Sequence, residues 1–100
     1  MTFCLKLLPE AEQDVRDLRQ FYDNQASGLG DYCADAIVTD LDRLKFFAGI
    51  HPKVFGYYRS LVHRFPLSIY YSVIKDEVII VGILDNRKSP KKTYKILRGR

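Results

Sequence analysis

The 100-residue sequence has little of what metal sites, disulfide frameworks and membrane spans require. It holds two cysteines and two histidines, and their spacing matches no metal-ligand motif, so we expect no metal and no cofactor. No apolar run approaches the ~20 residues of a membrane-spanning helix. The apolar start is too short for a signal peptide and acids follow it at once, which favours a cytoplasmic protein that binds no membrane. In that setting we expect Cys4 and Cys33 to be reduced and buried.

Acidic residues are absent from the last part of the chain, and this absence is more informative than the net charge of +4. Residues 87–100 carry seven Lys or Arg and no Asp or Glu. Residues 10–42 are the acidic counterpart, with nine Asp or Glu against only Arg16 and Arg19. The charge is therefore polarised along the chain, and its basic end is the part expected to approach a polyanion first.

The composition that is present indicates a folded protein. Apolar residues make up 47% of the sequence and aromatic residues 13%, which excludes a disordered chain. A chain of 100 residues has room for one domain with one modest core. Since there is no internal repeat and no low-complexity segment, we predict a single domain over residues 1–100 that ends in a basic tail over residues 87–100.

The second half of the chain is rich in β-strand signals. Two runs, residues 67–73 and 78–84, flank a short charged link over residues 75–77 that is typical of a hairpin loop. The second run, VIIVGIL, is apolar at nearly every position, which predicts a central strand covered on both faces. Residues 57–64 predict one more strand, and residues 48–56, with two glycines and a proline, predict a loop before it.

The first half predicts two helices joined by a turn. Proline suits a first helical position, and apolar residues then recur every three or four positions over residues 9–26. A glycine-containing turn over residues 27–30 separates this helix from a second one over residues 31–47, with Asp31 as its N-cap. The predicted buried faces are Ala11, Val15, Leu18 and Tyr22 on the first helix, and Cys33, Ala36, Ile37, Leu41 and Leu44 on the second. Asp40 is predicted to lie outside the buried stripe.

Together these elements predict an α+β fold. An N-terminal strand over residues 3–8 is followed by the helical hairpin and then by a three-stranded antiparallel meander. One small twisted sheet with two helices on one face is the simplest architecture that covers the apolar stripes. The other face of the sheet would then be partly open and lined by short polar and basic side chains, and we expect function there.

Several short motifs follow one another in a recognisable order and spacing. They are Leu8-Pro9, Gly28-Leu29-Gly30-Asp31, His51-Pro52, Tyr58-Arg59-Ser60-Leu61, Arg64-Phe65-Pro66, Ile69-Tyr70-Tyr71, and Ile83-Leu84 leading to Arg87-Lys88-Ser89-Pro90. This series resembles the RelE/ParE superfamily of type II toxin–antitoxin toxins. The segment RFP-x-x-IYY-x-V with its downstream basic pair is similar to the ParE-like, plasmid stabilisation branch in particular.

The resemblance implies a small growth-inhibiting toxin and a cognate antitoxin that wraps it, neutralises it and forms an oligomer with it. ParE-like members bind DNA gyrase and stall it without chemistry of their own. RelE-like members cleave messenger RNA, so whether this chain is an enzyme stays open. We expect a DNA gyrase inhibitor; the alternative is an mRNA endoribonuclease, or mRNA interferase, that acts on the ribosome or free. Exposed apolar patches near the first helix and the sheet edge are expected where the antitoxin binds.

The same resemblance supplies the candidate site residues. Arg59 stands where ribonuclease members carry one lysine of a pair, but the partner position is Leu61, and Ser68 replaces an expected arginine. Lys88 and Tyr94 keep the family spacing of a basic residue followed six positions later by a tyrosine. The candidate catalytic residues of a nuclease, which needs a base and cations around the phosphorane, are Arg59, His63, Arg64, Arg87, Lys88 and Tyr94. The candidate target-binding residues are Arg87, Lys88, Lys91, Lys92 and Lys95.

Overall fold

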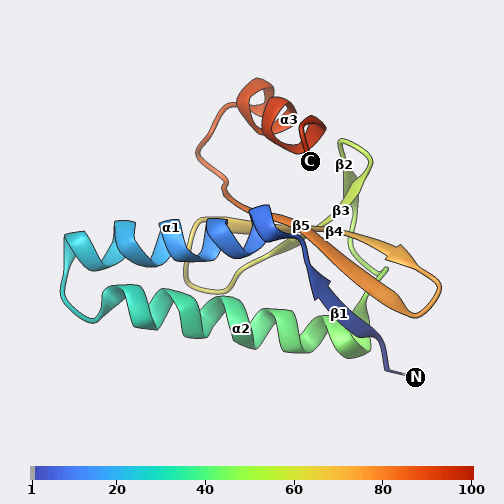
Figure 1. Ribbon diagram of the computed structural model, residues 1–100, viewed down its shortest axis with the longest axis horizontal. Helices are drawn as coiled ribbons and strands as arrows, with labels where there is room; N and C mark the ends of the chain where they lie inside the picture. Colours follow the sequence, from blue (N-terminus) through green and yellow to red (C-terminus); the bar gives the residue numbers. More distant parts are fainter. Residues whose placement is uncertain (1) are drawn as a thin grey trace.

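The protein is described by a computed structural model over residues 2–100, in which one five-stranded sheet has helices on both faces (Figure 1). In chain order the elements are β1 (Cys4–Leu7), α1 (Pro9–Gln25), α2 (Leu29–Phe47), β2 (Lys53–Val54), β3 (Tyr57–Leu61), β4 (Leu67–Ile74), β5 (Glu77–Asp85) and α3 (Pro90–Arg98). The strand order is β1-β5-β4-β3-β2. None of the helices within residues 2–100 is long and apolar enough to cross a membrane.

The predicted α+β class, helical hairpin and antiparallel meander are confirmed, but the sheet has more strands than the meander. The first strand, β1, pairs in parallel with β5, which makes β5 an interior strand as its apolar sequence predicts. The predicted loop over residues 48–56 contains a short strand, β2, which pairs with the start of β3. This hairpin closes at Phe55 and Gly56, which both have positive φ angles of 56° and 83°.

The predicted strand over residues 57–64 is too long at its end. The strand β3 stops at Leu61, and the chain turns before β4 begins at Leu67. Arg64 has a φ of 71° in this turn, which no regular strand residue adopts. His63 and Arg64 therefore lie in a turn and not on the sheet, contrary to the prediction.

The helical hairpin begins its second helix earlier than predicted. Gly28 adopts a left-handed φ of 88° before α2, and its carbonyl accepts the hydrogen bond from the Tyr32 N–H at 3.2 Å. Asp31 is thus inside the first turn instead of at the N-cap, and its carboxylate pairs with Arg19 on α1. Gly30 is needed because a Cβ there would lie only 2.3 Å from the carbonyl oxygen of Arg19. The two helices approach each other closely at this glycine.

The main core lies between the helical hairpin and the sheet. Both predicted helical stripes face it, and the fully buried strand residues of the same core include Leu67, Ile69, Tyr71, Val78 and Ile80. Cys33 is buried and free as predicted, and burial raises the pKa of its thiol to about 11. Cys4 is also free, but the prediction that it is buried is wrong, since the edge strand β1 exposes it.

The predicted basic tail contains a helix, α3, that packs on the second face of the sheet. Ser89 caps it by accepting a hydrogen bond from the Lys92 N–H at 3.3 Å, and proline follows at the first helical position. Thr93 and Leu97, four residues apart, are buried beneath it. The second core is formed by Tyr70, Val81, Leu84 and Leu97. The expectation of a partly open, polar sheet face is therefore wrong where α3 covers it.

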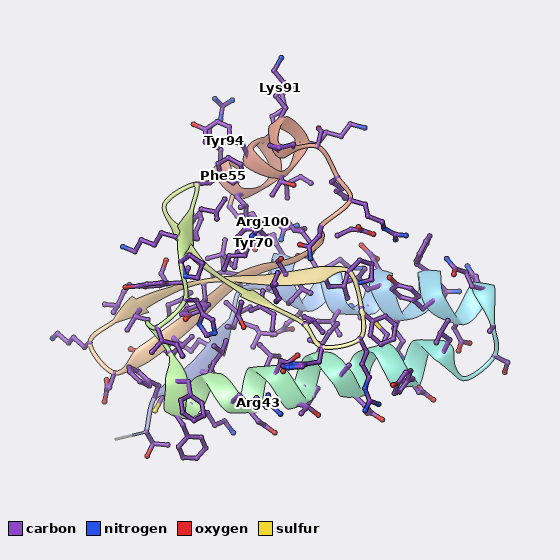
Figure 2. The ribbon with its side chains drawn as sticks, turned by 180° about the vertical axis from the view of Figure 1, so that it is seen from behind. Arg43, Phe55, Tyr70, Lys91, Tyr94 and Arg100 are labelled. Atoms are coloured by element: carbon purple, nitrogen blue, oxygen red, sulfur yellow. The ribbon has the colours of Figure 1, made fainter. Side chains whose placement is uncertain are left out.

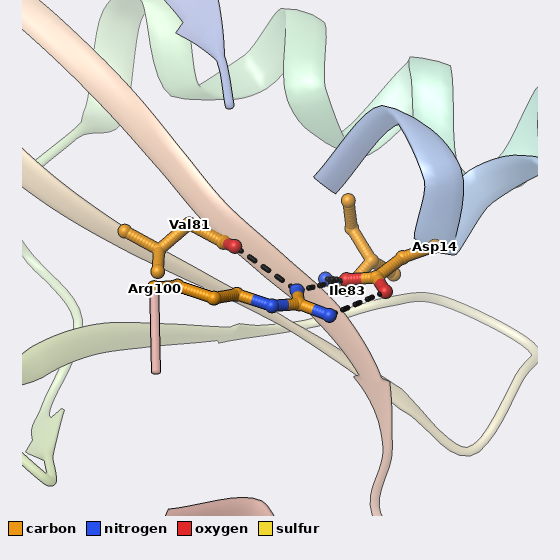
Figure 3. A network of polar contacts seen from close by, with 4 residues as sticks. All are labelled: Asp14, Val81, Ile83 and Arg100. Atoms are coloured by element: carbon orange, nitrogen blue, oxygen red, sulfur yellow. Dashed lines mark hydrogen bonds and ion pairs between the residues drawn. The ribbon is translucent and has the colours of Figure 1, made fainter. Parts of the chain in front are cut away.

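An ion pair between Arg100 and Asp14 joins the end of the chain to α1 (Figure 3). Both oxygens of the Asp14 carboxylate accept hydrogen bonds from the guanidinium, and the two side chains are only 11% and 14% exposed. Asp14 also accepts from the Ile83 N–H at 3.0 Å, and Arg100 donates to the Val81 carbonyl at 3.1 Å. The pair thus bonds to the backbone of β5 as well as to itself.

The position of this ion pair follows from the sheet register. The pairing of β1 with β5 ends at Ile80, so the edge of β5 beyond it has no neighbouring strand. The register with β4 shifts at the same place, where Tyr70 is opposite Gly82 and Tyr71 is opposite Ile80. A Cβ on Gly82 would lie 2.8 Å from the Arg100 guanidinium, so glycine leaves room for it. The ion pair takes the place of a strand at this edge.

We expect Asp14→Asn to destabilise the protein by about 3 kcal/mol, because the change leaves a largely buried guanidinium without its counter-charge. The measurement is the free energy of unfolding from urea denaturation. Asp17→Asn is the control, because Asp17 lies on the exposed side of the same helix and accepts a hydrogen bond only from Gln13. Equal stability of the two variants would contradict the role given to the ion pair.

Candidate functional site

A small pocket of about 160 Å³ lies where α3, β3 and the segment after β5 meet. Two of the predicted site residues, Arg59 and Lys88, contribute to its wall. The complete lining is Val54, Phe55, Arg59, Tyr70, Asp85, Asn86, Lys88, Pro90 and Thr93. The pocket therefore brings two cations together from segments that are nearly thirty residues apart in the sequence.

Arg59 is the residue of this pocket whose side chain has a buried hydrogen-bond donor without a partner. It lies on β3, where its backbone N–H donates to the Pro52 carbonyl at 2.9 Å. Its side-chain Nε is buried and has no hydrogen-bond partner. A buried donor without a partner costs about 1–3 kcal/mol, so Arg59 destabilises the folded chain at this position.

The two basic residues that follow β5 have different surroundings. Arg87 binds Asp85 through two hydrogen bonds, from Nη2 at 2.7 Å and from Nε at 3.0 Å. This guanidinium lowers the pKa of the Asp85 carboxyl. Lys88 has no carboxylate partner within residues 2–100. Of the predicted pair, Lys88 is therefore the cation that is free to bind a ligand.

Tyr94 and the predicted lysines lie on the outer side of α3. Figure 2 shows Tyr94 beside Phe55 at the edge of the helix, while Lys91 points away from the sheet. The ring centroids of Tyr94 and Phe55 are 5.5 Å apart. Tyr94 is not part of the pocket wall that Arg59 and Lys88 share. The structure therefore separates Tyr94 from the two residues with which the nuclease alternative would combine it.

Ser68, which stands in place of an expected arginine, is not on an open surface. It is fully buried on β4, and its hydroxyl donates a hydrogen bond to the Asn86 side-chain oxygen. The interpretation of Ser68 as part of an exposed floor is therefore wrong. Leu61, at the other position where a cation is missing, is exposed and carries no charge. Neither position supplies a positive charge near Arg59.

His63 and Arg64 lie in the turn between β3 and β4, and His63 lines a groove along β3 that Arg59 also lines. The Asp40 carboxylate accepts from the His63 N–H at 2.8 Å and lies 2.9 Å from its Nδ1. Asp40 is 4% exposed, so the prediction that it lies outside the buried stripe is wrong. The spacing of Asp40 indicates a buried position, because it stands three residues after Ile37 and four before Leu44 on the same helical face.

Two grooves are bordered by exposed apolar side chains. One, of about 480 Å³, runs between the second half of α2 and the edge of β3, and Phe47, Ile50 and Leu61 beside it are more than half exposed. The other, of about 360 Å³, lies between α1 and β5 and includes the half-exposed Phe21. The predicted apolar patches near the first helix and the sheet edge are confirmed.

The buried Tyr71 contacts the loop between α2 and β2, which borders the larger groove. The Tyr71 hydroxyl accepts from the Gly49 N–H at 2.9 Å and lies 2.5 Å from His51 Nδ1. A hydroxyl that accepts from Gly49 keeps its proton and a second lone pair, so either partner can donate in the contact with His51, according to the tautomer of the imidazole. Burial lowers the pKa of His51. Within residues 2–100, no three His, Cys, Asp or Glu side chains gather as metal ligands would.

We expect Arg59→Met to raise the free energy of unfolding by about 1 kcal/mol, because it removes a buried donor that has no partner and keeps the apolar stem. The measurement is urea denaturation monitored by circular dichroism. Arg16→Met on the exposed side of α1 is the control and should leave stability within about 0.5 kcal/mol of the wild type. A clear loss of stability in Arg59→Met would show that the guanidinium is satisfied in solution.

His51 is expected to make stability fall in mild acid. The pKa of His51 in the folded chain lies below the ordinary value of 6.5. As the pH falls below 6.5, the unfolded chain therefore binds a proton at this residue more readily than the folded chain does. The free energy of unfolding should therefore decrease from pH 7 to pH 5, and the His51→Gln variant should lose that part of the decrease. His63→Gln is the matched control, which keeps His51 and its pH dependence. Parallel pH profiles for wild type and His51→Gln would contradict this account.

Comparisons with known proteins support the fold. No protein-family model matches the sequence, and no curated protein matches it. One solved structure with a similar chain is described as "Chromosomal ParDE TA system from P. aeruginosa", where TA stands for toxin–antitoxin. The superposition has a TM-score of 0.76 at 21% sequence identity and covers 84% of this chain and 96% of that one. The chain therefore shares its fold with a chain of a structure described as a ParDE toxin–antitoxin system.

Proposed function

We propose that the protein is the toxin of a type II toxin–antitoxin system and arrests bacterial growth by binding and poisoning DNA gyrase. The observation that carries this proposal is the fold, which is shared over most of both chains with a chain of a ParDE system. The order of motifs from Leu8-Pro9 to Arg87-Lys88-Ser89-Pro90, similar to the ParE-like branch, points the same way. The protein would act in the cytoplasm, where the target and the antitoxin are made.

The surroundings of Arg59 favour binding over catalysis. A phosphoryl transition state needs several cations and a base around one point, and loss of a single such group costs roughly 3–4 kcal/mol. Here the pocket holds Arg59 and Lys88, while Ser68 is buried under α3 and Tyr94 lies outside the pocket wall. A protein that stalls gyrase by occupying it needs no such cluster.

The apolar grooves suit a partner that covers them. The larger groove combines exposed apolar side chains with the outer edge of β3, which β2 pairs only at Tyr57 and Tyr58. The Arg59 N–H also donates to the Pro52 carbonyl, so the part of the β3 edge that can accept a segment of another chain by β-strand addition is its end at Ser60 and Leu61. A cognate antitoxin that fills the grooves would bury Phe47, Ile50 and Leu61 and keep the toxin inactive.

One observation favours the alternative function, an mRNA endoribonuclease. The buried Nε of Arg59 has no partner and faces the same small pocket as Lys88. Such a pair suits a phosphate group of RNA. His63, the candidate base, lines the groove of about 480 Å³ together with Arg59, and its Nδ1 lies 2.9 Å from Asp40 there. This second candidate therefore has two histidines, His51 and His63, in a groove that Arg59 also lines, but Lys88 and Tyr94 do not line that groove.

The two functions predict different outcomes for purified protein. A gyrase poison should inhibit supercoiling by purified gyrase, increase the amount of cleaved DNA and leave translated messages intact. Arg59→Met should then keep its inhibition of supercoiling within about threefold, because gyrase binding by an exposed surface does not use the buried Nε. The measurements are agarose-gel supercoiling and cleavage assays together with transcript mapping in an induced culture.

An mRNA endoribonuclease would give the opposite pattern. Shortened transcripts, unaffected supercoiling, and relief of growth arrest by Arg59→Met would together overturn the gyrase proposal and favour the endoribonuclease. Arg16→Met, which removes an exposed cation from α1, serves as the control for loss of charge alone.

A further inference from the structure

The outer surface of α3 carries positive charge that no acid neutralises. Residues 87–100 hold seven basic residues and no acid, and two of these are paired, Arg87 with Asp85 and Arg100 with Asp14. The remaining five have no ion pair within residues 2–100 and form what we call the α3 basic surface: Lys88, Lys91, Lys92, Lys95 and Arg98. All five side chains belong to exposed residues.

The helix orders the backbone of four of these cations, and Lys88 lies two residues before it. Leu97 and Thr93 are buried against the sheet, and Arg100 anchors the end of the chain to α1. On the outer side, Tyr94 packs against Phe55 of the β2–β3 turn, with ring centroids 5.5 Å apart (Figure 2). A charged tail loses conformational entropy when it binds, whereas the α3 basic surface is already ordered.

Lys95 and Arg98 stand in the last turn of α3, where the helix dipole favours positive charge, but the other two cations of the helix oppose its stability. Lys91 and Lys92 are in the first turn, where the helix dipole disfavours positive charge, and this turn contains no acid. Lys91 and Lys95 are four residues apart, so two like charges are neighbours on one face. Each arrangement costs some tenths of a kcal/mol in the isolated protein. A bound polyanion would reverse the sign of both effects.

The helical hairpin carries the opposite charge, so the molecule has one basic side and one acidic side. Residues 10–42, with nine acids, form most of the helical hairpin, and α3 lies across the sheet from it (Figure 1). The two ends of this charge separation are thus on opposite faces of the sheet. A polyanion would be attracted to the α3 face and repelled from the hairpin face, which orients the protein before contact.

We propose that the α3 basic surface binds the phosphate backbone of duplex DNA without regard to sequence. From Lys91 to Arg98 the helix rises about 10 Å, a distance over which a duplex presents roughly six phosphates along its axis. The outer side of the helix has a shallow hollow of about 450 Å³, lined by Lys91, Lys92, Lys95 and Arg98 together with Ser89 and Tyr94, in which a phosphate group can lie between the cations. A helix also fits into the major groove, which is about 12 Å wide. Single strands favour free aromatic faces, but Tyr94 already packs on Phe55 and lies 5.8 Å from the Arg98 guanidinium.

This inference goes beyond the proposed function, because it concerns naked DNA and holds with or without gyrase. The experiment measures fluorescence anisotropy of a labelled 24-bp duplex of arbitrary sequence, titrated with the full-length protein at several KCl concentrations. Wild type should bind with a steep salt dependence. The triple variant K91Q/K92Q/K95Q should bind at least about tenfold more weakly at low salt, and its slope of log affinity against log salt should be smaller by about 2 to 3.

The matched control is the triple variant R16Q/R43Q/K75Q, which removes the same number of exposed cations from α1, α2 and the β4–β5 turn. It should keep the wild-type salt slope to within about 1. If both triple variants lose the same amount, net charge explains binding and the α3 basic surface is not the site. If wild-type protein shows no salt-dependent binding to the duplex, the proposal is wrong.

A second readout needs no variant. Acetylation of the wild-type protein by a lysine-reactive reagent, followed by mass spectrometry, should show Lys91, Lys92 and Lys95 protected when the duplex is present and Lys75 unprotected. Equal protection of all four would overturn the assignment. Tighter binding to a 24-nucleotide single strand of DNA or RNA than to the duplex, or binding only to vesicles that contain phosphatidylserine, would also overturn the choice of duplex DNA.

Discussion

The ion pair between Asp14 and Arg100 is the contact on which the arrangement of the second sheet face depends. It lies where β1 stops pairing with β5, and it bonds the exposed backbone of β5 through Val81 and Ile83. A largely buried charge needs its partner, so the end of the chain must return to α1. That return lays α3 across the sheet and buries Leu97. One ion pair thus closes an open strand edge and covers a face.

The presence of α3 on the sheet changes what the fold can do. It buries the face on which a nuclease of this architecture would spread its cations, and it leaves one small pocket with Arg59 and Lys88. It also converts a basic tail into an ordered positive surface on the outside. The described residues therefore offer two kinds of surface for a partner, the grooves beside α1 and α2 and the α3 basic surface.

Local patterns were enough to predict most of the secondary structure. The stripe of apolar residues on each helix, and the apolar run of β5, are set by residues close together in the sequence, and they appear in the structure as predicted. Where the backbone has positive φ angles, the predicted ends of the helices and strands differ from the observed ends by a few residues. Gly28 and Arg64 have positive φ angles, and they start α2 early and end β3 early. Periodicity carries no information about such turns.

The sequence by itself determined the α+β class, the helical hairpin, the meander and the polarised charge, because spacing and composition act through near neighbours. Only the tertiary structure decided which side chains meet. It brought Arg59 to Lys88, separated Tyr94 from them, and buried Asp40 beneath His63. It also placed α3 on the sheet, since the partner of Arg100 is 86 residues away. Contacts over such distances depend on the packing of the whole chain, which no local pattern encodes.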